Sequence, residues 1–255
     1  MPHQLDDLGT HAWVARTGGN LTTAEQRCLL RRLAAAQATN AAGRLATLLR
    51  LNPGRRTLVS KHEHPLPHST LTRAAEALAR CQLSPALLNH SYRTYTFGAA
   101  LGELDNMDVD RELLFAAALL HVVGLRTPVP RVDFTRDSAR VARDVAEEVG
   151  LSTAATDNLR TAITLHPSPG VTLAHDPVAY LLSAGSWLDV VGLRSWQLPP
   201  DVLSSALAAH PRLGFKRDFG AAYRAEAARV PRGRVALLRR YGAFDLAIKG
   251  APFRG

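Results

Sequence analysis

Residues 113–125 read LLFAAALLHVVGL, a run in which His121 carries the only polar side chain. These 13 residues are too few to cross a bilayer, because a membrane-spanning helix takes about 20 apolar residues. A leucine- and alanine-rich run of this length is typical of a buried helix. We therefore expect a core helix here and no insertion into a membrane.

Helical spacing of apolar residues continues on both sides of this run, and patterns typical of strands are nearly absent. Thr22 and Glu25 have the spacing of a capping box, which marks the start of one helix. The sequence predicts an all-α helical bundle, with helices over residues 24–40, 45–49, 71–81, 85–104, 110–124, 136–149, 153–165, 176–192, 200–209, 212–229 and 232–248.

Turn residues divide the chain. Asn52, Pro53 and Gly54 interrupt the helical pattern, and residues 55–69 have the composition of an irregular connector. We expect an N-terminal helical extension over residues 1–69, a helical core over residues 70–220, and a C-terminal helical extension over residues 221–255 that packs on the core.

The composition is that of a folded protein, with 46% hydrophobic and 21% charged residues. The two cysteines, Cys28 and Cys81, have no metal-binding spacing, which excludes a thiolate zinc site and a dense disulfide framework. We expect them to be buried thiols in a reducing compartment. The first residues lack the basic and apolar pattern of a signal peptide, so a cytoplasmic location is expected.

The chain is basic, with 31 Lys and Arg against 22 Asp and Glu and a net charge of +9. Only three of the basic residues are lysines, so the arginine content fits a compositional bias as well as it fits nucleic-acid binding. No basic stripe alternates with aromatic residues, as single-strand binding requires. We expect a dispersed charge and no specific nucleic-acid binding, although local arginine clusters occur around Arg31 and between Arg229 and Arg240.

Three of the ten histidines, His90, His121 and His166, lie on helices that are otherwise apolar. An unpaired imidazole is costly to bury, so each of them needs a polar partner. A single one is explained by a hydrogen bond within the core. Three on separate helices, together with Asp189 in another apolar segment, favour one shared polar pocket.

Five separated pieces of sequence carry a family resemblance: NHSYRTY at residues 89–95, ELLFAAALLHVVGL at 112–125, DSAR at 137–140, AITLH at 162–166 and LDVVG at 188–192. Their order and spacing resemble the HD superfamily of metal-dependent, phosphohydrolase-like proteins, in particular a bacterial branch related to cyanamide hydratase. The resemblance covers about residues 67–219 and implies an HD-domain-like helical bundle.

The resemblance also implies roles for particular residues. His90, His121 and Asp189 match metal ligands, and Arg93 and His166 match residues that line the catalytic site. The implied cofactor is a divalent metal: zinc, iron or manganese. Val122 stands where the family's His-Asp pair has its aspartate, and Thr135 stands where we would expect another acidic residue. Since valine has no lone pair to give, metal occupancy is in question.

Two functions from different classes follow. The first is an HD-type enzyme of small-molecule metabolism, a hydrolase or hydratase with a buried His and Asp pocket and a small polar substrate. The second is a catalytically degenerate HD scaffold that binds a small ligand or a protein partner without metal. A basic helical nucleic-acid binder ranks third. Substrate identity and oligomeric state do not follow from the sequence.

Overall fold

The structure of the protein is a computed structural model that describes residues 7–57, 59, 66–126 and 129–254. Twelve α-helices and no strand occur in these ranges, which confirms the all-α prediction. The α-helices are α1 (His11–Thr17), α2 (Thr23–Leu48), α3 (Thr70–Gln82), α4 (Pro85–Leu104), α5 (Arg111–Leu120), α6 (Phe134–Glu148), α7 (Thr153–Leu165), α8 (Pro177–Val191), α9 (Pro200–Ala209), α10 (Phe215–Arg229), α11 (Arg234–Tyr241) and α12 (Phe244–Lys249).

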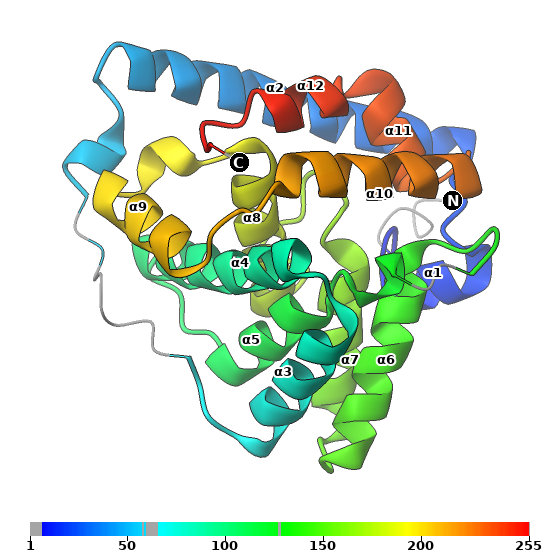
Figure 1. Cartoon of the computed structure of the whole chain (residues 1–255). Coiled ribbons are helices and arrows are strands. Elements are labelled where there is room, and N and C mark those ends of the chain that lie inside the picture. The colour runs from blue at the N-terminus through cyan, green and yellow to red at the C-terminus, as the bar shows by residue number, and fades with distance from the viewer. Residues whose placement is uncertain (1–6, 58, 60–65, 127–128, 255) are drawn as a thin grey trace.

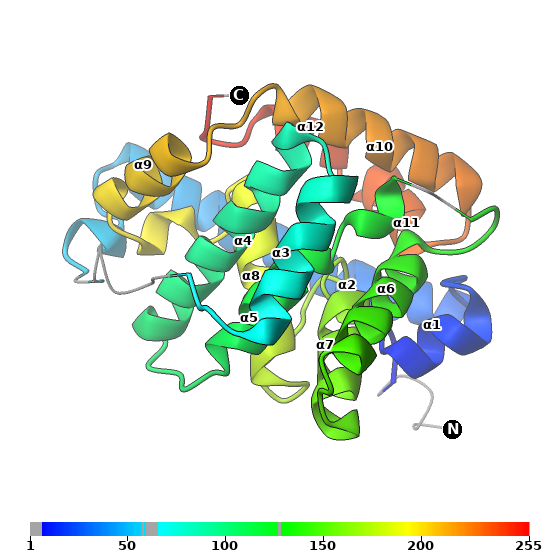
Figure 2. The same cartoon turned by 60° about the horizontal axis from the view of Figure 1, so that its bottom comes forward.

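The helices form layers around α8. Figure 1 shows α3, α5, α6 and α7 on one side of α4 and α8, and α2, α10, α11 and α12 on the opposite side. The turned view in Figure 2 keeps this arrangement, with α3, α5, α6 and α7 in front and α2 behind. Helix α8 packs on α4, α5 and α7 and also touches α12, so its buried face lies at the centre of the molecule.

Glycines let α4 and α8 approach closely. A Cβ atom added at Gly185 of α8 would lie 2.2 Å from the carbonyl oxygen of Thr94, and one added at Gly98 of α4 would lie 2.8 Å from that of Leu181. Backbone therefore lies directly against backbone where these helices cross. The contact fixes the relative position of α4 and α8, which carry His90, Arg93 and Asp189.

Two predicted helix boundaries are wrong. The segments 24–40 and 45–49 form one continuous helix, α2, in which Gly43 leaves room for the Trp196 ring. The segment 232–248 forms two helices, because the chain turns at Gly242 and Ala243 has the left-handed φ of 46°. The short helix α1 was not expected, whereas the capping box of Thr22 and Glu25 at the start of α2 is present.

Cys28 is half-buried and Cys81 is exposed, and both are free thiols, so the expectation of two buried thiols is wrong. In the part of the chain that the structure describes, no helix combines the length and the apolar character needed to cross a membrane.

Candidate functional site

The predicted site residues come from four helices. His90 and Arg93 lie one turn apart on α4, and Asp189 lies near the end of α8. His121 and His166 are the residues that directly follow α5 and α7. All five are at most 1% exposed, so the structure buries every one of them between the layers.

Asp189 is surrounded by donors. Its Oδ1 accepts hydrogen bonds from Arg93 Nε at 2.8 Å and from Arg212 Nη1 at 2.7 Å. Its Oδ2 accepts from His90 Nδ1 at 2.7 Å and from Arg93 Nη2 at 2.9 Å. Burial alone would raise the pKa of this carboxyl, but the hydrogen bond from His90 and the Arg93 guanidinium hold that pKa well below its usual range. Asp189 is therefore ionised and bonded through both oxygens.

The guanidinium of Arg93 is fully engaged. Two of its nitrogens bind Asp189, and the third, Nη1, donates to the carbonyl oxygens of His210 at 2.7 Å and Pro211 at 3.3 Å. Arg93 thus ties α4 to α8 and to the loop before α10. In this arrangement it holds Asp189 in place and points no nitrogen at an open site.

Hydrogen bonds set the tautomers of the three histidines. The Nδ1 atoms of His121 and His166 lie 2.6 Å from the carbonyl oxygens of Ala118 and Ile163, which can only accept, so both Nδ1 atoms carry the proton. His90 Nδ1 likewise donates to Asp189. In the neutral form, each Nε2 is therefore a bare acceptor.

These Nε2 atoms lie close together. His90 Nε2 and His121 Nε2 are 3.2 Å apart, and the His121 and His166 rings stand perpendicular with centroids 4.8 Å apart. His166 Nε2 is buried without a hydrogen-bond partner among the described residues. Burial lowers the pKa of His90, brings that of His166 to about 3 and, together with the neighbouring histidines, holds that of His121 well below its usual value. The cluster is a neutral group of facing acceptors.

The side chains that could ligate a metal ion do not fit the metal centre that the sequence resemblance implies. Val122, next to His121, is fully buried and offers no lone pair, and Asp189 already binds two guanidinium groups and His90. Across the described ranges, no three His, Cys, Asp or Glu side chains are arranged to hold a metal ion. The possible metal ligands that face each other closely are the Nε2 atoms of His90 and His121.

One cavity beside the cluster is small. It has a volume of about 10 Å³, touches His166 and is also lined by Trp187, Tyr223 and Phe244. This is about the space of one water molecule and is far below that of a ligand pocket. The five residues expected to line a substrate pocket are brought together in one buried polar network.

Sequence reasoning missed two buried arginines. Arg212, 4% exposed, follows Pro211 in a loop without periodicity and completes the shell of Asp189. Arg234, fully buried, binds Asp133 at 2.9 Å and Thr135 at 2.9 Å, beside α7 and His166. The residue at position 135, where an acidic side chain was expected, is Thr135, and its hydroxyl donates to Asp133 at 2.7 Å.

No local signal in the sequence suggests the Arg212 contact. Helix α10, which follows it, begins with the residues FKRD, so one more basic side chain before this helix does not stand out. Nothing local points to Arg234 either, because its partners lie about 70 and 100 positions away along the chain.

Comparison with known proteins gives one family. Residues 87–199 match the model of the HD domain, and this range contains all five predicted site residues but neither Arg212 nor Arg234. No curated protein matches the chain. HD domains are generally metal-dependent, which makes the engaged carboxylate of Asp189 the main point of difference in this site. The match covers 113 of the 255 residues and supports HD-superfamily membership for this part of the chain.

Proposed function

We propose that this chain is an HD-domain protein in which a buried ion-pair network takes the place of the metal centre, and that it acts by binding and not by metal-dependent hydrolysis. The observation that carries this proposal is the bonding of Asp189, whose two oxygens accept four hydrogen bonds from Arg93, Arg212 and His90. Val122 then takes the place of the second carboxylate.

Energetics support a structural role for Asp189. Turning its carboxylate toward a metal would leave the guanidinium groups of Arg93 and Arg212 buried and unpaired. Removing one partner of a buried ion pair costs about 3 to 5 kcal/mol. Bidentate, charge-assisted hydrogen bonds such as those of Arg93 are also among the strongest in proteins.

A second candidate is an HD-type hydrolase or hydratase of small polar molecules, as the resemblance implies. One observation favours it. The facing Nε2 atoms of His90 and His121 repel each other unless a cation or a proton lies between them, and His166 Nε2 has no hydrogen-bond partner among the described residues. In this candidate His166 and Arg93 keep their expected catalytic roles.

Metal analysis separates the two candidates. The full-length protein is purified without chelator, its zinc, iron and manganese content is measured, and its thermal unfolding is followed with and without each added metal. The proposal expects less than stoichiometric metal and an unchanged unfolding temperature.

If the protein contains stoichiometric metal, matched variants show which residues bind it. Stoichiometric metal that is lost in His90→Gln and His121→Gln but kept in Asp189→Asn would contradict the proposal and support an enzyme with imidazole ligands. Metal lost in all three variants would restore the ligand set expected from the sequence resemblance.

A further inference from the structure

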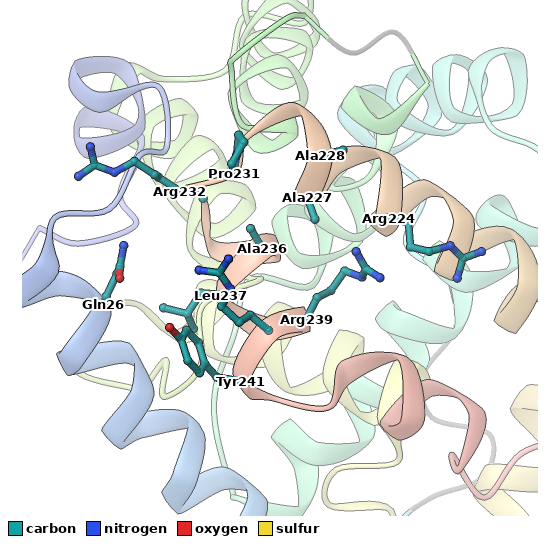
Figure 3. A pocket seen from close by; sticks show the side chains of 12 residues that line it. Gln26, Arg224, Ala227, Ala228, Pro231, Arg232, Ala236, Leu237, Arg239 and Tyr241 are labelled. Atoms are coloured by element: carbon teal, nitrogen blue, oxygen red, sulfur yellow. The ribbon is translucent and has the colours of Figure 1, made fainter.

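A groove on the opposite side of the molecule from α3 and α5 is lined by arginines. Figure 3 shows it between the end of α10, α11 and the start of α2, with Arg224, Arg232 and Arg239 around it. Its volume is about 460 Å³. Four of the twelve lining residues are arginines, none is acidic, and the full arginine set is Arg224, Arg232, Arg239 and Arg240.

The C-terminal part of the chain is rich in basic residues. Residues 215–255 contain ten Lys and Arg and three Asp and Glu, a net charge of +7. Residues 11–56 carry the same net charge, with eight arginines and one glutamate, so the basic residues are not confined to one part of the sequence. Like charges gathered around one groove still raise its local potential and attract anions.

One acidic residue neutralises part of the groove. Asp245 pairs with Arg239 at 2.7 Å and is also close enough to Arg224 to interact with it electrostatically, while Arg232 donates to the carbonyl oxygen of Leu21 at 3.2 Å. Arg224 and Arg240 are exposed and form no ion pair or hydrogen bond with any described residue. Two guanidinium forks are thus available to an incoming ligand.

We propose that this groove binds a small molecule carrying at least two phosphate groups. Arginine forks match the geometry of phosphate oxygens, and several of them around one groove favour a ligand with several charges. The volume lies within the 300 to 1,000 Å³ that is typical of small-molecule sites. Tyr241, 53% exposed at one end of the groove, offers a ring face for an aromatic group of that ligand.

The same features argue against a nucleic-acid strand as the occupant. A strand needs a basic track with several aromatic side chains on which successive bases stack. Tyr241 is the only aromatic residue among the twelve that line this groove. The groove therefore fits a compact anion better than an extended polymer. Anion binding in this groove is independent of whether the His and Asp network is catalytic.

The test is calorimetric titration of the full-length protein at physiological salt with inorganic phosphate, pyrophosphate, tripolyphosphate and ATP. We expect pyrophosphate or tripolyphosphate to bind at least about tenfold more tightly than phosphate. If ATP binds more tightly than tripolyphosphate, the ligand is a nucleotide. If the two bind equally, the ligand is a polyphosphate.

The decisive variant is Arg224→Gln with Arg240→Gln, both exposed, and we expect a loss of affinity of about tenfold or more. The control is Arg143→Gln with Arg217→Gln, which removes the same charge outside the groove. An equal loss in the control, no preference over inorganic phosphate, or tighter binding of a single-stranded oligonucleotide would each overturn the proposal.

Discussion

At the scale of single residues, Asp189 of α8 is bonded to α4 and to the loop before α10. Arg93 reaches it from α4, Arg212 from the loop before α10, and His90 from the previous turn of α4. Such a network stabilises only when every member is satisfied, since a buried charge without a partner is costly.

We therefore predict that Asp189→Asn lowers the free energy of unfolding by about 3 to 5 kcal/mol. Asparagine keeps the shape but removes the charge that both guanidinium groups need. The control is Asp144→Asn, whose half-exposed pairs with Arg140 and Arg143 should cost less than about 1 kcal/mol. Urea unfolding followed by circular dichroism measures both, and equal effects would remove the argument for a structural Asp189.

Val122→Asp tests the other position at which a carboxylate was expected. Val122 is fully buried, so an aspartate there should destabilise the protein by several kcal/mol in the absence of metal. If His90 and His121 can share a cation with it, zinc or manganese should restore part of the thermal stability. Val123 is buried next to Val122, so Val123→Asp should destabilise the protein to a similar degree, and added metal should not restore its thermal stability.

The residues of the candidate site that stand out from their local sequence were predictable. His90, His121, His166 and Asp189 stand out because each is polar in an apolar helix. Arg212 acts from a loop, and its identity as a partner depends on how the chain folds back from α9 to α8. Asp133 is likewise buried with a partner, Arg234, that lies about 100 positions later in the chain.

At the scale of elements, the α4 and α8 crossing depends on residues without side chains. We predict that Gly185→Ala lowers the free energy of unfolding by about 1 to 3 kcal/mol, because the new methyl group would lie 2.2 Å from a backbone oxygen of α4. Gly220→Ala in α10 is the control, since its methyl group meets only Arg224 at 3.5 Å and alanine favours the helix. A stable Gly185→Ala protein would show that the helices can separate without cost.

Glu226 connects α10 to the start of α6 and gives a pH dependence of known sign. It accepts the amide of Phe134 at 3.0 Å and pairs with Arg229, but burial together with the nearby Asp133 outweighs both contacts and raises its pKa to about 7. The folded protein therefore keeps a proton that the unfolded chain loses near pH 4.3. This contribution to stability is lost as the pH rises from about 4.5 to 7.

Glu226→Gln removes this titration and still accepts the Phe134 amide. We expect the stability of the variant relative to the natural protein to increase between pH 4.5 and pH 8, by roughly 2 to 3 kcal/mol. Denaturant unfolding at the two pH values measures it. Glu147→Gln, on the exposed end of α6, controls for the loss of one negative charge. A difference that does not change with pH would mean that Glu226 is ionised in the folded protein.

The helix pattern was largely predictable, and its errors have a common cause. Apolar periodicity locates α3 to α10 because their buried faces follow the helical repeat. The predicted interruption between residues 40 and 45 is absent, because Gly43 lies inside α2 and admits the ring of Trp196, whereas the chain does turn at Gly242, inside the predicted helix 232–248. Whether a glycine ends a helix or allows close packing depends on the neighbouring element, which the local sequence does not contain.

At the scale of the whole molecule, the N-terminal segment is tied to both other proposed segments. The carbonyl oxygen of Gly18 accepts the amide of Asp133 at 3.0 Å, and the amide of Leu21 donates to Arg232 at 2.9 Å. Trp13 is fully buried, donates to Glu25 at 2.7 Å and lies under the guanidinium of Arg234. The proposed division at residues 69 and 220 therefore describes segments of sequence that share their buried contacts.

These contacts predict one cooperative unfolding transition. In a protein with Trp187→Phe and Trp196→Phe, the fluorescence of Trp13 reports on the N-terminal segment alone, while far-ultraviolet circular dichroism reports on all helices. The two signals should coincide in urea, as they do when a protein unfolds in one step. If Trp13 changes at a clearly lower urea concentration, residues 1–69 form a separate unit, and the contacts with Asp133 and Arg232 contribute little to its stability.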